Sequence, residues 1–260
     1  MTHRPLALVT GASRGIGFEL ARLLAAGGHD LILVARSAEP LEALANDLRG
    51  RYRIGIRTCS VDLSEPGAAA VFWRELGDAG GNLDVLINNA GIGLHGPLWS
   101  QARDALDRLL TLNVASPVTL TRLALPAMLA KQRGHVLNVA SVVGFQPGGP
   151  GMSAYYASKA FILSFSKGLN RELRGSGVSL TVLCPGTTAT SFDKEAGAAE
   201  TRLYRWMPSM AAAAVARAGY RGMMRGSSVV VPGIVAKLMA FAGELPPRRI
   251  ALEVNRLLLR

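Results

Sequence analysis

Short apolar segments alternate with amphipathic segments along most of the chain, and this alternation restricts the fold more than any other feature. Strands that alternate with helices form a parallel sheet, and strands covered on both faces are apolar nearly throughout. We therefore predict a doubly wound α/β fold with three layers and about seven parallel strands. The predicted strands are residues 6–10, 31–35, 56–63, 84–88, 135–140, 179–184 and 228–233.

The segments between the strands carry apolar residues at helical spacing, which predicts helices over residues 17–26, 38–48, 68–76, 102–130 and 153–173. Residues 187–226 interrupt the alternation and are rich in Ala, Met and Arg. We predict that this segment is a substrate lid inserted before the last strand. The sequence contains no internal repeat or linker, so residues 1–260 are expected to form one domain with a basic, apolar tail at 234–260.

The composition is that of a folded domain. With 260 residues, 49% hydrophobic and 18% charged, the chain can bury a large core, which excludes disordered, fibrous and disulfide-scaffold classes. No apolar run reaches the roughly 18 residues of a membrane span. Cys59 and Cys184 lie far apart without metal-ligand spacing. We expect buried thiols, no metal site, and a cytoplasmic protein.

A glycine-rich turn follows the first strand and begins the first helix. Its glycines, Gly11, Gly15 and Gly17, allow a tight turn and let backbone N–H groups approach a pyrophosphate at the helix N-terminus. The spacing G-x-x-x-G-x-G differs from the general G-x-G-x-x-G fingerprint. A turn without a ligand is the alternative, but the strand before and the helix after it favour a dinucleotide site.

The residue after the second strand indicates which dinucleotide is bound. NAD-selective sites place Asp or Glu there to bind the ribose 2′-hydroxyl, whereas an arginine accommodates a 2′-phosphate. Here the residue is Arg36, and Arg14 in the glycine turn supplies a second positive charge. The sequence therefore favours NADP(H) over NAD(H). The alternative is that Arg36 merely faces solvent in a chain with 29 basic residues.

Further motifs follow at the ends of later strands and helices: Asp62, Asn88-Asn89-Ala90-Gly91, Asn113, Ser141, Tyr155-x-x-x-Lys159 and Pro185-Gly186. With Thr10-Gly11-x-x-x-Gly15-Ile16-Gly17 they make almost the whole chain resemble the short-chain dehydrogenase/reductase family. The resemblance implies a Rossmann-type oxidoreductase, with Asp62 at the adenine, Asn89 to Gly91 along the adenosine ribose, and Thr190 near the carboxamide. The predicted cofactor-binding residues are Gly11, Ser13, Arg14, Gly15, Ile16, Gly17, Arg36, Asp62, Leu63, Asn89, Ala90, Gly91, Asn113, Tyr155, Lys159, Pro185, Gly186, Thr188 and Thr190.

The chemistry of the Tyr155 and Lys159 pair can be argued from the residues themselves. A tyrosine with a pKa near 10 is a poor base at neutral pH, so an acid/base role needs a nearby cation. Lys159 lies four residues later on the same helix, where the two side chains are neighbours. Tyr156 has Ala160 at the corresponding position, so Tyr155 is the predicted acid/base.

We predict that Tyr155 protonates the alkoxide formed in carbonyl reduction and that Ser141 hydrogen-bonds the same oxygen. By resemblance, Asn113 holds a water that extends the proton path from Lys159. Each residue alone has a structural explanation. The alternatives are a chain that binds NADP(H) as a sensor or scaffold without turnover, and a basic membrane-associated protein on this fold. Ser141 and Tyr155 are separated by 14 positions, where the family usually shows 13. Residues 147–151, rich in Gly and Pro, are predicted to absorb the difference without disturbing the catalytic group.

The net charge is +11, and residues 200–260 contain ten basic and three acidic residues. Three explanations remain open: a tail helix packed on the body or on a partner subunit, a peripheral membrane helix, and a funnel for an anionic substrate. Nucleic-acid binding is not expected, because no nucleic-acid motif accompanies the charge. In the predicted tail helix Ile250, Val254 and 257–259 share one face, and Arg249, Glu253, Arg256 and Arg260 surround the other.

The tail resembles a bacterial subgroup related to 3-oxoacyl-CoA reductases and 17β-hydroxysteroid dehydrogenases, which implies a lipophilic carbonyl or alcohol substrate. The helices at 102–130 and 153–173 resemble the subunit-contact helices of the family, which implies a homodimer or homotetramer. Apolar side chains of the lid could contact the substrate or merely pack the lid: Phe192, Leu203, Tyr204, Trp206, Met207 and Met210.

Overall fold

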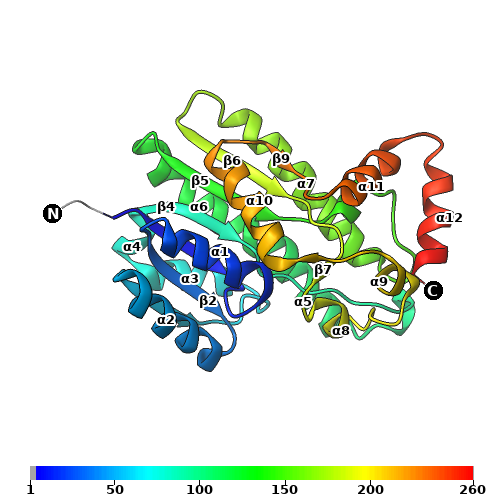
Figure 1. Ribbon diagram of the computed structural model, residues 1–260, viewed down its shortest axis with the longest axis horizontal. Helices are drawn as coiled ribbons and strands as arrows, with labels where there is room; N and C mark the ends of the chain where they lie inside the picture. Colours follow the sequence, from blue (N-terminus) through cyan, green and yellow to red (C-terminus); the bar gives the residue numbers. More distant parts are fainter. Residues whose placement is uncertain (1–3, 260) are drawn as a thin grey trace.

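The computed structural model describes residues 4–259, and its centre is a sheet of seven parallel strands (Figure 1). The prediction of a doubly wound parallel sheet is confirmed. Leu8 and Ile87, on adjacent central strands, are fully buried because helices cover both faces. In spatial order the strands are β3 (Ile56–Ser60), β2 (Asp30–Ala35), β1 (Leu6–Thr10), β4 (Leu83–Asn88), β5 (Gly134–Val139), β6 (Val178–Leu183) and β9 (Val229–Val230).

The strand order reverses between β1 and β4, which are direct neighbours in the sheet. The chain leaves these two strands toward opposite sides, so their carboxyl ends border the crevice in which open α/β sheets bind ligands. The glycine turn follows β1, and residues 89–91 follow β4. The two motifs predicted to hold a dinucleotide therefore start from the two strands at this reversal.

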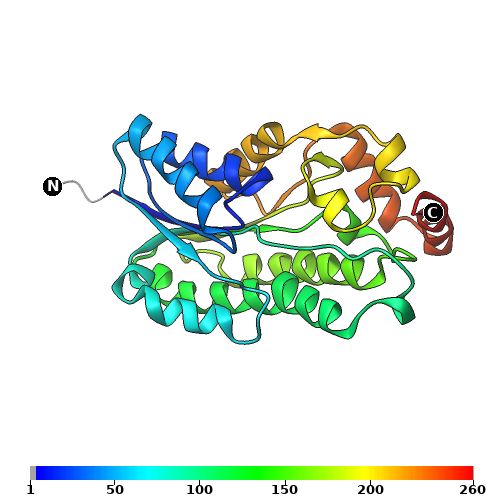
Figure 2. The same cartoon turned by 90° about the horizontal axis from the view of Figure 1, so that it is seen from below.

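Two layers of helices cover the sheet (Figure 2). One contains α1 (Gly15–Ala26), α2 (Ala38–Tyr52) and α10 (Ala212–Met224), and the other contains α3 (Ala68–Leu76), α6 (Ser116–Ala130) and α7 (Ser153–Glu172). The remaining elements are α4 (Asp78–Gly81), α5 (Arg103–Leu110), α8 (Phe192–Glu195), α9 (Arg202–Trp206), α11 (Ile234–Glu244), α12 (Arg248–Leu258), β7 (Thr188–Ala189), β8 (Met210–Ala211), 3₁₀ turns at Leu98–Ser100 and Val142–Phe145, and a π-helical turn at Thr111–Ala115.

The structure divides the segment that was predicted to be a lid, 187–226. Its first part contains α8 and α9, whereas its last part is α10, which packs on α1 with Val215 fully buried. Gly219 lets α10 approach β6, because a Cβ there would lie 2.7 Å from Leu183 Cδ2. α10 is therefore a core helix, and only the part of the segment before it can cover a site.

Several boundaries also differ from the predictions. The last strand is Val229–Val230 rather than 228–233, and α2 continues to Tyr52 rather than ending at residue 48. The third strand ends at Ser60 rather than at residue 63, and the helix predicted over 102–130 is interrupted by the π-helical turn. A π-helical turn contains about one residue more than an α-helical turn, and the spacing of apolar residues does not reveal it. The sequence pattern therefore did not predict this interruption. Among residues 4–259, no helix combines the length and apolar character needed to cross a bilayer.

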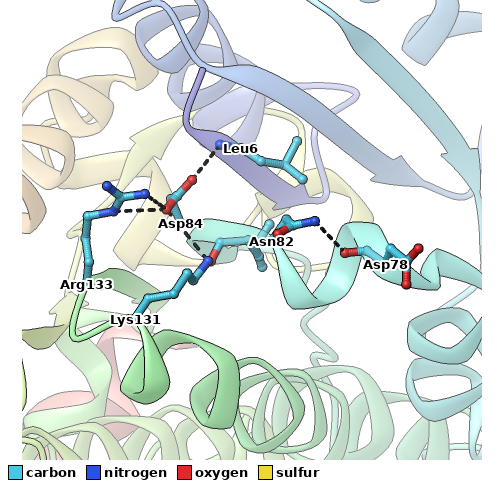
Figure 3. A network of polar contacts seen from close by, with 7 residues as sticks. Leu6, Asp78, Asn82, Asp84, Lys131 and Arg133 are labelled. Atoms are coloured by element: carbon cyan, nitrogen blue, oxygen red, sulfur yellow. Dashed lines mark hydrogen bonds and ion pairs between the residues drawn. The ribbon is translucent and has the colours of Figure 1, made fainter. Parts of the chain in front are cut away.

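A buried carboxylate holds the amino-terminal ends of β1 and β4 together (Figure 3). Asp84 accepts a hydrogen bond from the Leu6 N–H at 3.0 Å and pairs with Arg133 at 2.9 Å and Lys131 at 3.8 Å. Burial alone would raise the pKa of Asp84, but the Leu6 N–H, Arg133 and Lys131 outweigh it and lower the pKa. Asp84 therefore stays ionised and contributes to stability at neutral pH.

Replacing Asp84 by Asn is expected to lower the free energy of unfolding by about 1–3 kcal/mol, because the Leu6 N–H and two cations lose a charged acceptor. Since the folded pKa is lowered, this contribution is present above the unfolded value near 4 and lost as the pH falls through the folded value. Denaturant unfolding at pH 7 and at lower pH measures it. Asp78→Asn is the matched control, because only the Asp78 backbone carbonyl accepts a hydrogen bond in this network. Equal losses in both variants would contradict the assignment.

Candidate active site

A cavity of about 540 Å³ lies at the carboxyl ends of the central strands. It collects side chains and backbone from loops after β1, β2, β3, β4, β5 and β6, and from α7. Of the predicted site residues, only Gly17 and Asn113 do not line it. The predicted residues that do are Gly11, Ser13, Arg14, Gly15, Ile16, Arg36, Asp62, Leu63, Asn89, Ala90, Gly91, Ser141, Tyr155, Lys159, Pro185, Gly186, Thr188 and Thr190.

Gly17 shapes the glycine turn from outside the cavity. A Cβ at Gly17 would lie 2.3 Å from the Gly11 carbonyl oxygen and 2.4 Å from Asn89 Nδ2, distances that real Cβ atoms essentially never show. Gly15 has φ +58°, a conformation that side chains disfavour, and the methyl of Thr190 lies 3.1 Å from its ideal Cβ position. The glycines thus bring the first helix, the turn and the Thr190 loop together.

The loop after β4 holds this turn by hydrogen bonds. Asn89 Nδ2 donates to the Thr10 and Gly11 carbonyl oxygens at 3.0 and 3.1 Å. In return, the Thr10 hydroxyl accepts from the backbone N–H groups of Asn89 and Ala90. These contacts use both Nδ2 hydrogens of Asn89, so this side chain fixes the glycine turn.

Charges at the β2 and β3 ends of the cavity are arranged around Asp62. The carboxylate accepts hydrogen bonds from the Ser64 N–H and hydroxyl at 2.9 and 2.6 Å, and pairs with Arg108. Burial would raise the pKa of Asp62, but these hydrogen bonds and the charges of Arg108 and Arg36 lower it. Asp62 is therefore an ionised acceptor, and Arg36 lies exposed beside it at the cavity edge.

Arg14, the second predicted cation, is already paired. Its guanidinium donates to the Glu195 carboxylate of α8, and both residues line the cavity. Both side chains are about half exposed, so solvent screens this pair and it contributes little to stability. A bound anion could exchange for Glu195 at small cost.

Tyr155, Lys159 and Ser141 line the same part of the cavity. Lys159 Nζ lies 5.8 Å from the centre of the Tyr155 ring and donates to the Val139 carbonyl oxygen at 3.1 Å. Burial lowers the pKa of Lys159 to about 8, so the ammonium form still prevails at pH 7. The hydrogen bonds of the Ser141 hydroxyl, to Pro185 O and from Val143 N, are long at 3.4 and 3.3 Å. That hydroxyl can turn toward a ligand at small cost.

Asn113 lies in the π-helical turn, behind the cavity wall. Its Oδ1 accepts from the Ile92 N–H at 2.9 Å, and its Nδ2 donates to Ile92 O and to the Ser158 hydroxyl. Asn113 Oδ1 and Lys159 Nζ lie 3.2 and 3.3 Å from the ideal Cβ position of Gly91. The π turn, frequent at functional sites, thus places Asn113 beside Lys159.

Sequence reasoning missed a buried polar network beneath the site. Asn88 Nδ2 donates to Asn138 Oδ1 at 2.9 Å and to the Thr121 hydroxyl at 3.0 Å, and Asn138 Nδ2 donates to Ser166. Asn138, Thr121 and Ser166 are fully buried. These contacts join β4, β5, α6 and α7, so they fix the strand ends that carry the site. The signal available was the pair of asparagines, Asn88 and Asn138, near the carboxyl ends of two strands predicted to be buried.

The first part of the predicted lid borders the cavity. The Phe192 ring lies 5.3 Å from the Tyr155 ring, and Leu203 is buried at the wall. Trp206, Met207 and Met210 do not line the cavity, and the side chain of Tyr204 lies outside what the structure describes. The lid therefore offers Phe192 and Leu203 to an apolar ligand.

The C-terminal segment supports the other wall, which sequence reasoning also missed. Asn255 of α12 is buried and donates to the Gly148 carbonyl oxygen at 2.7 Å, inside the loop predicted to absorb one extra residue. His95 Nε2 lies 3.0 Å from the Leu259 carbonyl oxygen. Asn255 and Leu259 share the face of α12 that packs on the body, whereas Ile250, Val254 and Leu257 are exposed. Of the face that carries Ile250, Val254 and residues 257–259, only the last residue is therefore buried against the body, and Arg260 lies outside the described residues.

The family model described as short chain dehydrogenase matches residues 5–201. The chain belongs to this family. Dehydrogenase/reductase SDR family member 7B of Bos taurus is 37% identical over 202 residues, which make up 76% of this chain and 62% of that protein. The chain thus spans less than two thirds of this relative's length. The family is one of oxidoreductases, and its fold binds a nicotinamide cofactor.

Solved structures of the short-chain dehydrogenase family agree with the fold. A short-chain dehydrogenase from Sphingobium yanoikuyae in complex with NADPH is 36% identical with a TM-score of 0.82, covering 92% of both chains. The bulky-bulky ketone specific alcohol dehydrogenase from Comamonas testosteroni is 32% identical, with a TM-score of 0.79 over 93% of this chain and 91% of that one. A short-chain dehydrogenase/reductase from Burkholderia phymatum in complex with NAD shares the fold. It is 23% identical, with a TM-score of 0.82 over 97% of this chain and 95% of that one.

Replacing Lys159 by Met is expected to raise the free energy of unfolding at pH 7 by about 1–3 kcal/mol, because a buried charge is removed at the cost of one hydrogen bond. The folded pKa, about 8, lies below the unfolded value, so the unfolded wild type binds more protons between the two values. The free energy of unfolding of the wild type therefore rises with pH between these two pKa values. The difference in free energy of unfolding between the wild type and Lys159→Met becomes smaller over the same range.

Thermal unfolding at pH 7 and at higher pH measures this gap. Lys194→Met, which removes an exposed lysine from α8, is the matched control and should change stability by less than about 0.5 kcal/mol. A Lys159→Met protein that is less stable than wild type at pH 7 would contradict the cost assigned to the buried ammonium.

Proposed function

We propose that the protein transfers hydride between NADP(H) and a carbonyl or secondary alcohol group, with Tyr155 as the general acid/base. The observation that carries the proposal is that Tyr155, Lys159 and Ser141 line one cavity with the glycine turn and Arg36. The residues present fit a dinucleotide. The glycine turn is so tight that a Cβ at Gly17 would clash with it, and the cavity is also lined by the cations Arg14 and Arg36.

The nicotinamide, when bound, supplies the hydride in reduction and accepts it in oxidation. In reduction the Tyr155 hydroxyl donates its proton to the oxygen of the carbonyl group, where negative charge develops. The Ser141 hydroxyl, which makes only long hydrogen bonds, turns to donate to the same oxygen. The Lys159 ammonium stabilises the phenolate that remains. Asn113, beside Lys159, is suited to holding the water that returns a proton.

The proposed preference for NADP(H) rests on charge. Arg36 at the end of β2 and Arg14 in the glycine turn border the same cavity, and a 2′-phosphate carries charge that two guanidinium groups match. On binding, Arg14 exchanges Glu195 for the phosphate. The NADPH complex of the Sphingobium relative supports this preference.

For the substrate we propose a lipophilic ketone or the corresponding alcohol. Phe192, Leu203 and Met239 give the cavity an apolar wall near Tyr155, which a polar substrate would not fill favourably. The Comamonas relative, described as specific for bulky-bulky ketones, supports a ketone as the substrate.

We further propose a homodimer or homotetramer that assembles through α6 and α7. Phe161 of α7 is 46% exposed and stacks on Phe165, and Leu129 of α6 is 40% exposed. Exposed apolar side chains on neighbouring helices of this kind favour subunit contacts.

Replacing Tyr155 by Phe is expected to lower turnover at least about 100-fold, because the phenyl ring keeps the packing but has no proton to give. NADPH affinity should change by less than about threefold. Steady-state kinetics on a panel of lipophilic ketones and fluorescence titration with NADPH provide the measurements. Tyr156→Phe removes the neighbouring buried hydroxyl as a control. Turnover unchanged in Tyr155→Phe would rule out the acid/base assignment, and NADPH binding without turnover of any ketone would favour the sensor.

Replacing Arg36 by Asp is expected to weaken NADPH binding by about 10- to 100-fold, because a charged hydrogen bond is exchanged for repulsion. NADH affinity should stay within about threefold. Arg174→Asp makes the same change of charge at an exposed position after α7, and should affect neither nucleotide. Equal losses of NADPH and NADH affinity in Arg36→Asp would mean that Arg36 does not contact the 2′-phosphate.

A further inference from the structure

The side of α11 that faces away from the protein is apolar. Ile234, Leu238, Phe241 and Leu245 are spaced by four, three and four residues, so they share one helix face. They are 78%, 62%, 63% and 46% exposed. Ala236, Ala240 and Gly243, on the opposite face, are buried against the body. A surface helix ordinarily has the reverse arrangement, with its polar face in water.

The neighbouring helix α12 continues the pattern. Ile250, Val254 and Leu257 share one exposed face, and Arg249 and Arg256 lie beside them around the helix. α11 and α12 contact each other and lie together at one end of the molecule, beyond the sheet (Figure 1, Figure 2). Exposed apolar side chains on two adjoining helices mark an interaction surface.

The charges on this end have one dominant sign. α9, which contacts α12, bears Arg202 stacked over the Trp206 ring, and that tryptophan is 67% exposed. An exposed tryptophan beside cations suits the boundary between headgroups and acyl chains. Helices α9, α11 and α12 together carry six basic and two acidic side chains. The basic ones are Arg202, Arg205, Lys237, Arg248, Arg249 and Arg256, and the acidic ones are Glu244 and Glu253.

We propose that α9, α11 and α12 form a docking surface for an anionic phospholipid bilayer. Phe241, Leu238 and Ile250 enter the boundary of the acyl chains, and the arginines remain at the level of the anionic headgroups. Docking needs no membrane-spanning helix, because the apolar faces lie along the surface of the bilayer. The same charge opposes a second copy of the chain as the occupant, since two like basic surfaces would face each other.

The docking surface adjoins the cavity, so a ligand could pass from the bilayer into the cavity. Leu203 of α9 and Met239 of α11 line the cavity, and the Met239 carbonyl accepts a hydrogen bond from Gln146 at 2.6 Å. A lipophilic substrate dissolved in the bilayer would therefore reach the cavity without crossing water, a consequence that rests on the proposed function. The docking itself does not rest on it.

Cosedimentation with vesicles tests the proposal without any measurement of turnover. The probes are vesicles of phosphatidylcholine alone and of phosphatidylcholine mixed with phosphatidylserine. Wild type is expected to bind the mixed vesicles and to bind them less tightly at higher salt. The double substitution Leu238→Asp with Phe241→Asp should weaken binding to mixed vesicles at least about tenfold. Arg248→Ala with Arg249→Ala should also weaken it roughly tenfold or more on mixed vesicles, with little change on phosphatidylcholine.

Val71→Asp is the matched control, because Val71 is 44% exposed on α3, which belongs to the helix layer of α6. It should bind vesicles like wild type, and circular dichroism with thermal unfolding of every variant checks that the fold is retained. If the α11 variant does not fold, Ile250→Asp with Val254→Asp makes the same test on α12. No binding of wild type to mixed vesicles, or equal binding by the α11 and Val71 variants, would overturn the proposal. A third outcome would also overturn it: wild type does not bind vesicles, and the α11 variant forms a smaller oligomer than wild type. That result would identify a second copy of the chain as the occupant.

Discussion

The contact between the glycine turn and the loop after β4 is the constraint on which the site depends. The Asn89 amide bonds the Thr10 and Gly11 carbonyl groups, and Gly17 lies so close that a Cβ could not fit between them. Since β1 and β4 are the strands at which the sheet order reverses, this contact holds open the crevice and aligns its two walls. Every other group of the site is positioned relative to these two strands.

A second constraint follows from placing a charge beside the reacting group. The Lys159 ammonium is buried with one hydrogen bond, to the Val139 carbonyl, and burial lowers its pKa to about 8. The same desolvation strengthens its effect on the Tyr155 ring, because charges act over longer range where water is excluded. The protein thus gives up stability at the position where the proposed chemistry needs a cation. The buried network of Asn88, Asn138, Thr121 and Ser166 links the strands and helices that adjoin this position.

The C-terminal helices connect the site to the surface. Asn255 holds the loop at Gly148, Met239 lines the cavity, and the outer faces of α11 and α12 are apolar and basic. Parallel sheets place their ligand crevice at one edge, so elements that follow the last strand are the ones free to enclose it. In this protein the same elements form the wall of the pocket and the proposed docking surface.

The sequence by itself determined the fold and most of the residues around the cavity. Apolar runs separated by amphipathic segments admit one kind of sheet, and residues such as Gly15, Tyr155 and Lys159 follow strand ends or share a helix face, which local geometry fixes. Tertiary structure decided the rest: that α10 is a core helix, that Asn113 lies in a π turn, that Glu195 pairs with Arg14, and that Asn255 rather than Ile250 packs inward. These outcomes depend on which surfaces meet across long separations in sequence, and periodicity records that a face is apolar but not what covers it.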